Sequence, residues 1–341
     1  MIGAYGARIL HAPADVGGHA RGLSLGERAI GLQSEVAVFS PQGLGYEADI
    51  DLHSGVDVPV PVRMARRAAF LREAMERYDV FHFNYGQTLM QVRQLGRVFD
   101  ELPLLRRRGK KIIVTFQGCD LRPYSECFCR KPGCVRTTRY RQLLGERALA
   151  HADRVLYLNP DLGRWLPGAE FFPYANVDAL GIEPQTPADR EELVVVHAPT
   201  DRAVKGSRHV VEAIELLRAE GMRVRLDLLE GLTHDKVRER TAAADVVVDQ
   251  LMLGWYGGFA VEAMALAKPV LCFIREDHNP FGASLPIVRA TASTLVERLR
   301  ELLGDPARRA DLGAAGRRFV ETEHDPRRLA RRALEGIVEV P

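Results

Sequence analysis

Short runs rich in valine, isoleucine and phenylalanine alternate with segments of helical periodicity along the chain. Such runs predict buried strands, and the longer segments between them predict helices. In the first half, strands are expected at residues 8–12, 35–39, 80–84, 111–118, 154–158 and 169–174, with helices at 17–31 and near 91–108. In the second half, strands are expected at 192–199, 225–231, 246–250 and 269–274, and helices at 207–221, 233–243, 259–267, about 293–303, 306–323 and 326–338.

The order of these elements predicts an α/β protein with two domains. Apolar strands that alternate with helices form parallel sheets covered on both faces, and 341 residues exceed the roughly 250–300 that one core usually serves. Residues 182–192 contain Pro, Asp and Glu without periodicity and are interpreted as a linker. We therefore expect doubly wound domains at 1–181 and 193–325 that face a cleft, and a C-terminal helix within 326–341 that packs back on the first domain.

The composition excludes some classes of function. The chain is 46% hydrophobic and 27% charged, and its 47 basic residues leave a net charge of only +2, which argues against general nucleic-acid binding. No apolar run reaches the roughly 18 residues of a membrane span, and the N-terminus lacks the basic and apolar regions of a signal peptide. We expect a cytoplasmic protein, with peripheral association at the inner membrane face as a further option.

Two expected strand-to-helix loops of the second domain carry groups that suit a nucleotide sugar. GWYGG at 254–258 precedes a helix with one carboxylate, Glu262; the glycines let a ligand approach the backbone, and ribose or sugar hydroxyls would satisfy the carboxylate. HAPTDRAVKGSRH at 197–209 adds the cations Arg202 and Lys205, which a diphosphate needs. The alternatives are a Glu262 that interacts with the helix dipole or an arginine, and cations that are ordinary solvated surface charges.

These segments resemble the donor domain of retaining glycosyltransferases with the GT-B fold. The resemblance rests on Lys-Gly at 205–206 and on GWYGGFAVEAMALAKPV at 254–270, which is its most specific part. The loop at 17–18 and the stretch TFQGCDLR at 115–122 resemble the first domain of that family, so the resemblance covers nearly the whole chain. It implies a GT-B architecture with two Rossmann-like domains.

The resemblance also implies roles for individual residues. Glu262 matches the glutamate that binds the donor ribose, and Lys205 matches the lysine that neutralises the diphosphate. Three positions depart from the family: Gly254 replaces its first glutamate, Thr200 replaces an arginine for which Arg202 could substitute, and Gln117 stands where histidine is common. Asp249, Gln250 or Trp255 would then take over the role of the missing glutamate.

The candidate residues fall into three groups. The candidate catalytic residues are Lys205, Arg202, Glu262 and Asp249. The candidate donor-binding residues are His197, Thr200, Gly206, Glu230, Gly254, Trp255, Tyr256, Gly257, Gly258 and Phe259. The candidate acceptor-side residues are Gly17, Gly18, Gln117, Asp120 and Arg122, although Asp120 and Arg122 could instead form a structural ion pair.

The implied activity is transfer of a sugar from a nucleotide-diphosphate donor to a glycan, lipid-linked or small-molecule acceptor, with retention of configuration and without a catalytic metal. Two alternatives are a nucleotide-sugar 2-epimerase on the same fold and a non-catalytic protein that binds a nucleotide sugar or glycan. The absence of a glutamate at Gly254 is the main support for the non-catalytic alternative.

The remaining chemistry-bearing residues are cysteines and a strand histidine. Cys119, Cys127, Cys129 and Cys134 lie close together in the sequence and could hold a structural zinc ion; the alternatives are incidental thiols or a disulfide between the second and fourth of them. His82, within the strand at 80–84, is interpreted as a packed core residue.

Overall fold

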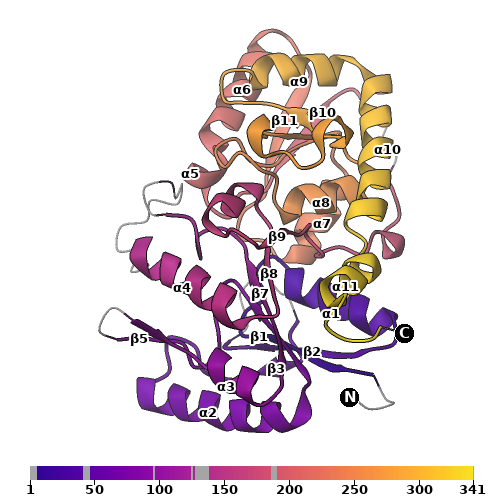
Figure 1. The fold of residues 1–341 in the computed structure, drawn as a ribbon. Helices are drawn as coiled ribbons and strands as arrows, with labels where there is room; N and C mark the ends of the chain where they lie inside the picture. Colours follow the sequence, from indigo (N-terminus) through magenta and orange to yellow (C-terminus); the bar gives the residue numbers. More distant parts are fainter. Residues whose placement is uncertain are drawn as a thin grey trace. The chain divides into compact units, whose positions relative to one another are not determined.

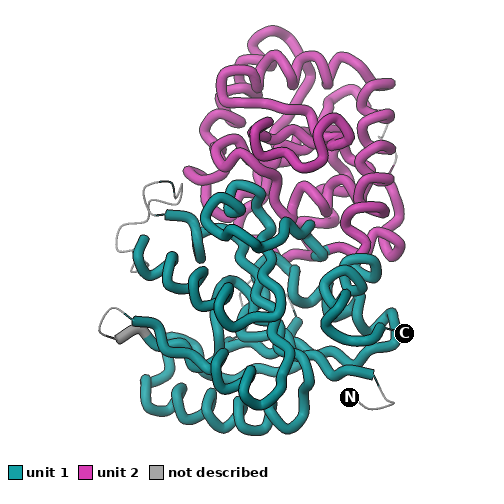
Figure 2. Tube along the Cα trace, in the orientation of Figure 1, with its two compact units in different colours: residues 1–176, 326–341 teal, residues 177–325 magenta. Residues whose placement is uncertain are grey.

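The computed structural model describes residues 6–40, 47–94, 97–123, 126, 138–185 and 190–340. The chain forms two compact units, residues 1–176 with 326–341 (unit 1) and residues 177–325 (unit 2) (Figures 1 and 2). The sequence had placed the boundary at 182–192, but unit 2 begins at Val177. The C-terminal residues from Pro326 onward belong to unit 1.

Unit 1 is built on a seven-stranded sheet in the order β3-β2-β1-β4-β7-β8-β9, in which every neighbouring pair is parallel. Its strands are β1 (Arg8–Ala12), β2 (Gln33–Val38), β3 (Ile50–Asp51), β4 (Val80–Asn84), β7 (Lys111–Phe116), β8 (Arg154–Tyr157) and β9 (Glu170–Phe171). Its helices are α1 (His19–Ala29), α2 (Val60–Arg77), α3 (Leu102–Arg107), α4 (Thr138–His151) and α11 (Pro326–Leu334).

Helices cover both faces of this sheet because successive strand residues alternate between two cores. Leu10, Phe81 and Ile112 pack with apolar residues of α2, α3 and α4. Their neighbours Ile9 and Val80 pack on the opposite face with residues of α1 and α11. The helices α1 and α11 therefore lie side by side although they come from opposite ends of the chain (Figure 1).

Unit 2 contains a five-stranded parallel sheet in the order β11-β10-β12-β13-β14. Its strands are β10 (Leu193–His197), β11 (Val224–Leu228), β12 (Val246–Val248), β13 (Val270–Cys272) and β14 (Val288–Arg289). Its helices are α5 (Arg202–Lys205), α6 (Ser207–Ala219), α7 (His234–Ala242), α8 (Gly258–Ala265), α9 (Leu295–Gly304) and α10 (Pro306–Glu323). The sequence-based prediction of two doubly wound parallel-sheet domains is confirmed.

The apolar helix α8 is buried from Ala260 to Ala265, as its composition predicts. It packs against α10, where glycines allow a close approach. A Cβ atom on Gly313 would lie 2.1 Å from the carbonyl oxygen of Ala267, so no larger residue fits there without movement of the backbone. The C-terminal end of α8 therefore lies in close contact with α10.

The predicted helix near 91–108 is wrong for most of its length. The strands β5 (Val92–Gln94) and β6 (Arg97–Phe99) form an antiparallel pair, and only α3 is helical. Within β6, Val98 is buried while Arg97 and Phe99 are exposed, which is the two-residue period of a strand. The helices α2 and α4 were not predicted.

No helix in the described part of the chain is long and apolar enough to cross a membrane.

Candidate functional site

The two loops singled out in the sequence meet at one edge of the unit 2 sheet. The strands β10 and β12 are parallel neighbours, so their carboxyl ends lie together. The backbone N–H of Leu251 donates a hydrogen bond of 3.1 Å to the carbonyl oxygen of Lys205. Gly206 has a φ of 77°, and a Cβ atom there would lie 3.1 Å from the Cβ of Leu251, so glycine permits this contact between the loops.

A buried ion pair lies where these loops meet. Lys205 Nζ is 2.8 Å from Asp249 Oδ1, and the side chains are 12% and 0% exposed. The second oxygen, Asp249 Oδ2, accepts a hydrogen bond of 2.7 Å from the backbone N–H of Gly257, the residue before α8. A Cβ atom on Gly257 would lie 3.3 Å from Lys205 Nζ. Asp249 therefore fixes the lysine beside the N-terminus of α8, where the helix dipole favours negative charge.

Glu262 lies one turn into α8 and has a partner that the sequence analysis missed. Its Oε1 atom is 3.0 Å from Nε2 of His234, the first residue of α7. The glutamate side chain is 10% exposed and the histidine side chain 26%. The contact with Glu262 raises the pKa of His234 above its ordinary value. The sequence does place His234 just after a strand and its loop, where a ligand-binding residue could lie. Histidines at such positions are also common in proteins where they have no function.

Arg202 and Glu230 form an exposed pair of their own. The guanidinium group donates two hydrogen bonds to the Glu230 carboxylate, and the two side chains are 61% and 37% exposed. Arg202 is the first residue of the short helix α5, which Asp201 caps by accepting bonds from two backbone N–H groups. Thr200 is also exposed. These residues lie on the exposed side of the loop, and the partly buried Lys205 is its inner cation.

Three predicted donor-binding side chains are buried and pack against the protein. His197 is fully buried; its Nδ1–H donates to the Val248 carbonyl oxygen and its Nε2 accepts from Ser207 Oγ, both at 2.8 Å. Burial lowers the pKa of His197, so the ring is neutral. Trp255 and Tyr256 are 3% and 0% exposed and belong to an aromatic cluster. These side chains support the site and do not line it.

The aromatic cluster fixes the loop before α8. Trp255 stacks on Phe281, with 6.2 Å between the ring centroids, and Phe281 meets Phe319 edge to face. The hydroxyl group of Tyr256 is 3.1 Å from His324 Nε2. Gly257, Gly258 and Phe259, which follow in the chain, are partly exposed. A ligand would therefore meet the backbone of Gly257 and Gly258 and the side chain of Phe259, and not the buried rings of Trp255 and Tyr256.

The glycine at 254 is required by the backbone. Its φ is 77°, and a Cβ atom there would lie 2.8 Å from Cγ of Arg275. A left-handed conformation costs a residue with a side chain about 1–2 kcal/mol. A glutamate at this position would therefore be strained, which explains the departure from the family pattern noted in the sequence.

The predicted acceptor-side residues lie in unit 1, at the loops after β1 and β7. Gly17 and Gly18 have φ values of 66° and 73°, and Gly18 precedes α1. The Asp120 carboxylate accepts hydrogen bonds of 2.8 and 2.6 Å from the backbone N–H groups of Gln117 and Gly118. Arg122 forms a two-bond ion pair with Asp161. Asp120 and Arg122 are buried and hold this turn, while the side-chain amide of the buried Gln117 carries no bond from Nε2 to any described residue.

Of the predicted zinc cluster, Cys127, Cys129 and Cys134 lie outside the described residues. Cys119 is partly buried after β7, and Cys272 is a buried core residue of β13. His82 is fully buried as expected, and its ring lies next to the tilted ring of a second buried histidine, His11.

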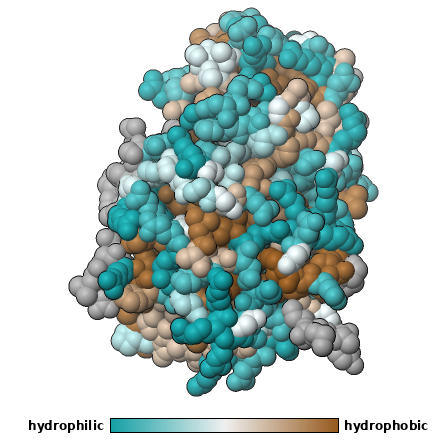
Figure 3. Space-filling model, in the orientation of Figure 1, coloured by the Kyte–Doolittle hydropathy of each residue, from teal (hydrophilic) through white to brown (hydrophobic). Residues whose placement is uncertain are grey.

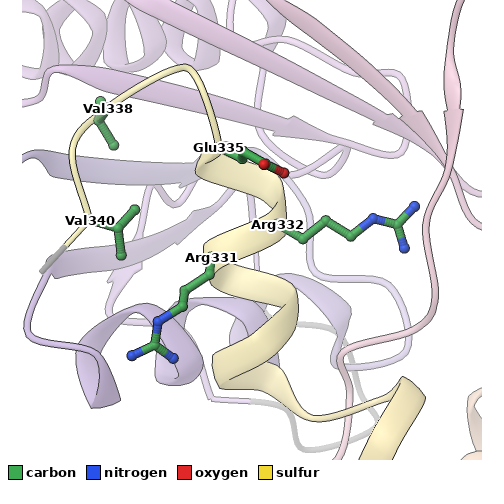
Figure 4. Close-up of a pocket in the computed structure, with 5 residues that line it drawn as sticks. All are labelled: Arg331, Arg332, Glu335, Val338 and Val340. Carbon is green, nitrogen blue, oxygen red and sulfur yellow. The ribbon is translucent and has the colours of Figure 1, made fainter.

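A surface hollow of about 480 Å³ lies in unit 1, apart from the predicted donor residues. Arg331, Arg332, Glu335, Val338 and Val340 line it (Figure 4). The two arginine side chains point away from each other, and Arg332 donates to the carbonyl oxygen of Phe171. The hollow thus lacks convergent polar groups for a small ligand.

Together, the two parallel-sheet units define a protein with the GT-B fold. The chain is similar to the solved structure of sucrose-phosphate synthase from Thermosynechococcus elongatus, with 18% identity over 95% of this chain and 97% of that one, at a TM-score of 0.68. It is also similar to WaaG, a glycosyltransferase involved in lipopolysaccharide biosynthesis (15% identity, 96% and 100% covered, TM-score 0.59), and to the glycotransferase of kitacinnamycin (16%, 96% and 99%, 0.52). No protein-family model and no curated protein matches the chain.

Proposed function

We propose that this protein is a glycosyltransferase that moves a sugar from a nucleotide-diphosphate donor to an acceptor with retention of configuration. The observation that carries the proposal is the arrangement at the edge of the unit 2 sheet, where Lys205 lies beside the N-terminus of α8 and Glu262 lies one turn further on. A cation and a helix N-terminus suit a diphosphate, and a nearby carboxylate suits the adjoining ribose. The similar folds of known glycosyltransferases add support.

In this proposal the leaving diphosphate is stabilised by fixed charge. Lys205 and the backbone N–H groups at the start of α8 meet the negative charge that develops as the glycosidic bond breaks. Asp249 acts as a positioning residue because it binds both Lys205 and Gly257. Arg202 would approach the phosphates only after leaving Glu230. No catalytic metal is needed for this role, since the protein supplies the positive charge.

The acceptor is proposed to bind unit 1 near Gly17, Gly18 and Gln117, and is a glycan, a lipid-linked sugar or a small molecule. Gly17 and Gly18, before α1, have left-handed backbone conformations and no side chains, so a ligand can approach the backbone there. The Gln117 amide offers a polar group at the carboxyl end of β7.

A thermal-shift screen tests the donor. We expect at least one sugar from a panel with UDP, GDP, ADP and dTDP carriers to raise the melting temperature, because a ligand that binds only the folded state stabilises it by mass action. Free sugars without the nucleotide serve as the control and should give no shift. The absence of a shift with every member at millimolar concentration would contradict the proposal.

Product analysis with the donor so found separates the alternatives. A transferase releases nucleoside diphosphate and does so faster when an acceptor is added. A 2-epimerase changes the sugar and keeps it attached to the nucleotide. A non-catalytic binding protein gives the melting shift and no new product.

Peripheral membrane association is a further part of the proposal. Val56, Val60 and Val62, at and before the start of α2, are 94%, 56% and 43% exposed, and the arginines Arg63 and Arg66 follow them. Hydrophobic residues reach the surface over part of α2 in the lower part of unit 1 (Figure 3). Exposed apolar residues beside arginines suit a surface of anionic lipid.

Vesicle sedimentation tests this association. We expect binding to vesicles with phosphatidylglycerol, weaker binding at high salt, and a several-fold loss for the variant Val60→Glu. The control is Leu216→Glu, which alters an equally exposed apolar residue on α6 of unit 2. Equal vesicle binding by the two variants would contradict the proposal that α2 contacts the membrane.

A further inference from the structure

A group of buried polar residues lies on the face of the unit 1 sheet that α1 covers. His11 on β1 and His82 on β4 are register partners in adjacent parallel strands, so their side chains leave the same face of the sheet. Their ring centroids are 4.7 Å apart. Glu27 on α1 places Oε2 at 2.8 Å from Nε2 of His11. The proposed sugar transfer uses none of the three.

These three side chains are buried with too few partners. Each is 0% exposed. The Nδ1 atoms of His11 and His82 and the Oε1 atom of Glu27 have no hydrogen-bond partner among the residues that the structure describes. A buried polar group without a hydrogen-bond partner costs about 1–3 kcal/mol of folding free energy. Three such atoms in one place therefore indicate that a bound ion or molecule supplies the missing interactions.

The donor set indicates what that occupant is. Two imidazoles and one carboxylate are a ligand set that Zn²⁺ accepts. One potential ligand atom from each residue lies within 4.8 Å of the other two. A tetrahedral ion about 2 Å from each ligand brings ligand atoms to roughly 3.3 Å from one another, a contraction that small side-chain rotations supply.

The local charge also suits a dication. Asp15 is a second buried carboxylate, 4% exposed, and it interacts electrostatically with His11. Its Oδ1 atom accepts a hydrogen bond from the backbone N–H of Ala20, and the backbone N–H of Arg21 also interacts with the carboxylate. A doubly charged cation would balance Asp15 and Glu27, which are otherwise costly to bury as anions.

We propose that His11, Glu27 and His82 form a buried site for a divalent transition-metal ion, with Zn²⁺ the ion that fits the ligands best. Because the three side chains have no exposed surface, the ion does not reach a substrate. Its role is structural: it ties β1 and β4 to α1. A buried water molecule is the competing occupant, since water also satisfies orphaned polar atoms.

Metal content tests the site. To remove the cysteine cluster as a second source of zinc, all measurements use a chain in which Cys127, Cys129 and Cys134 are serine. After growth with zinc and gel filtration, we expect about one zinc ion per chain by mass spectrometry, and at least a tenfold loss for Glu27→Gln, which keeps the size of the side chain and removes its charge. The matched control Glu101→Gln alters another buried glutamate of unit 1, whose carboxylate binds the backbone N–H groups of Leu89 and Met90; this variant should keep the zinc.

Cobalt provides a second measurement that does not depend on variants that fold poorly. Co²⁺ added to the zinc-free, cysteine-replaced chain should give visible absorption bands of a tetrahedral ion with nitrogen and oxygen ligands, and added Zn²⁺ should abolish them and raise the melting temperature. A parent chain that carries no zinc, gives no cobalt bands and shows no melting shift would overturn the proposal and leave water as the occupant. Equal zinc in the parent and in Glu27→Gln would do the same.

Discussion

Replacing Lys205 by methionine is expected to reduce the donor-induced melting shift strongly and to destabilise the protein at the same time. Loss of a charged hydrogen bond to the diphosphate should weaken donor binding about 10- to 100-fold, or about 1.5–3 kcal/mol. The variant also leaves Asp249 as a fully buried carboxylate without its cation, which costs about 3 kcal/mol of folding free energy. Denaturant unfolding and calorimetric titration measure the two effects separately.

The partner variant Asp249→Asn distinguishes a phosphate ligand from a purely structural ion pair. An asparagine oxygen can still accept the N–H bond of Gly257. It also frees Lys205 from a competing anion, so donor binding should persist or become tighter. The double variant with Lys205→Met should recover most of the lost stability and still fail to bind donor. If Asp249→Asn and Lys205→Met lost donor binding equally, Lys205 would not be a phosphate ligand.

Replacing Glu262 by glutamine is expected to weaken donor binding about 10- to 100-fold while the fold persists. The two side chains have the same shape, but the amide forms weaker hydrogen bonds with ribose hydroxyls than the carboxylate does. The control is His234→Asn, which removes one partner of Glu262 and leaves the carboxylate in place. Donor affinity should then change by only a few-fold. An equal loss in both variants would show that the pair, and not the carboxylate, is what matters.

The same two variants should change how stability depends on pH. In the folded protein the pKa of His234 is raised by Glu262, so the folded state binds the proton more tightly than the unfolded state does. The stabilisation is fully present below the unfolded pKa of about 6.5 and is lost as the pH rises through the folded pKa. The difference in unfolding free energy between the parent and either variant should therefore be larger at pH 6 than at pH 8.5. A difference that grows with pH would contradict this assignment.

Much of the fold could be predicted from the sequence because its strands are buried on both faces. Continuous apolar runs such as 193–197 and 246–248 mark central parallel strands whatever surrounds them. The segment at 92–99 misled the prediction since its strands are short and partly exposed, so their two-residue period covers few positions. The sequence did not predict the long helix α2, because only two of its residues, Leu71 and Ala74, are buried.

The meeting of the two candidate loops at one sheet edge was predictable from the sequence, but the contacts of their side chains were not. The Lys-Gly pair and the glycines before α8 identified the loops, because phosphate binding needs cations and open backbone at strand ends. The burial of Trp255 and Tyr256 could not be foreseen, since an aromatic residue next to a glycine suits a ligand surface and a core equally well. Their packing depends on Phe281 and Phe319, which come later in the chain.

The sequence by itself determined the alternation of strands and helices, the division into two parallel-sheet units, and the edge at which the charged loops would gather. These features follow from the spacing of apolar residues over short stretches, which a linear pattern records. Only the tertiary structure decided that Lys205 is held by Asp249, that Glu262 meets His234, and that two strand histidines face a helix glutamate. The reason is physical: each of these pairs joins residues that are distant in the chain, and a side chain acquires its partner, burial and charge state only when the elements pack.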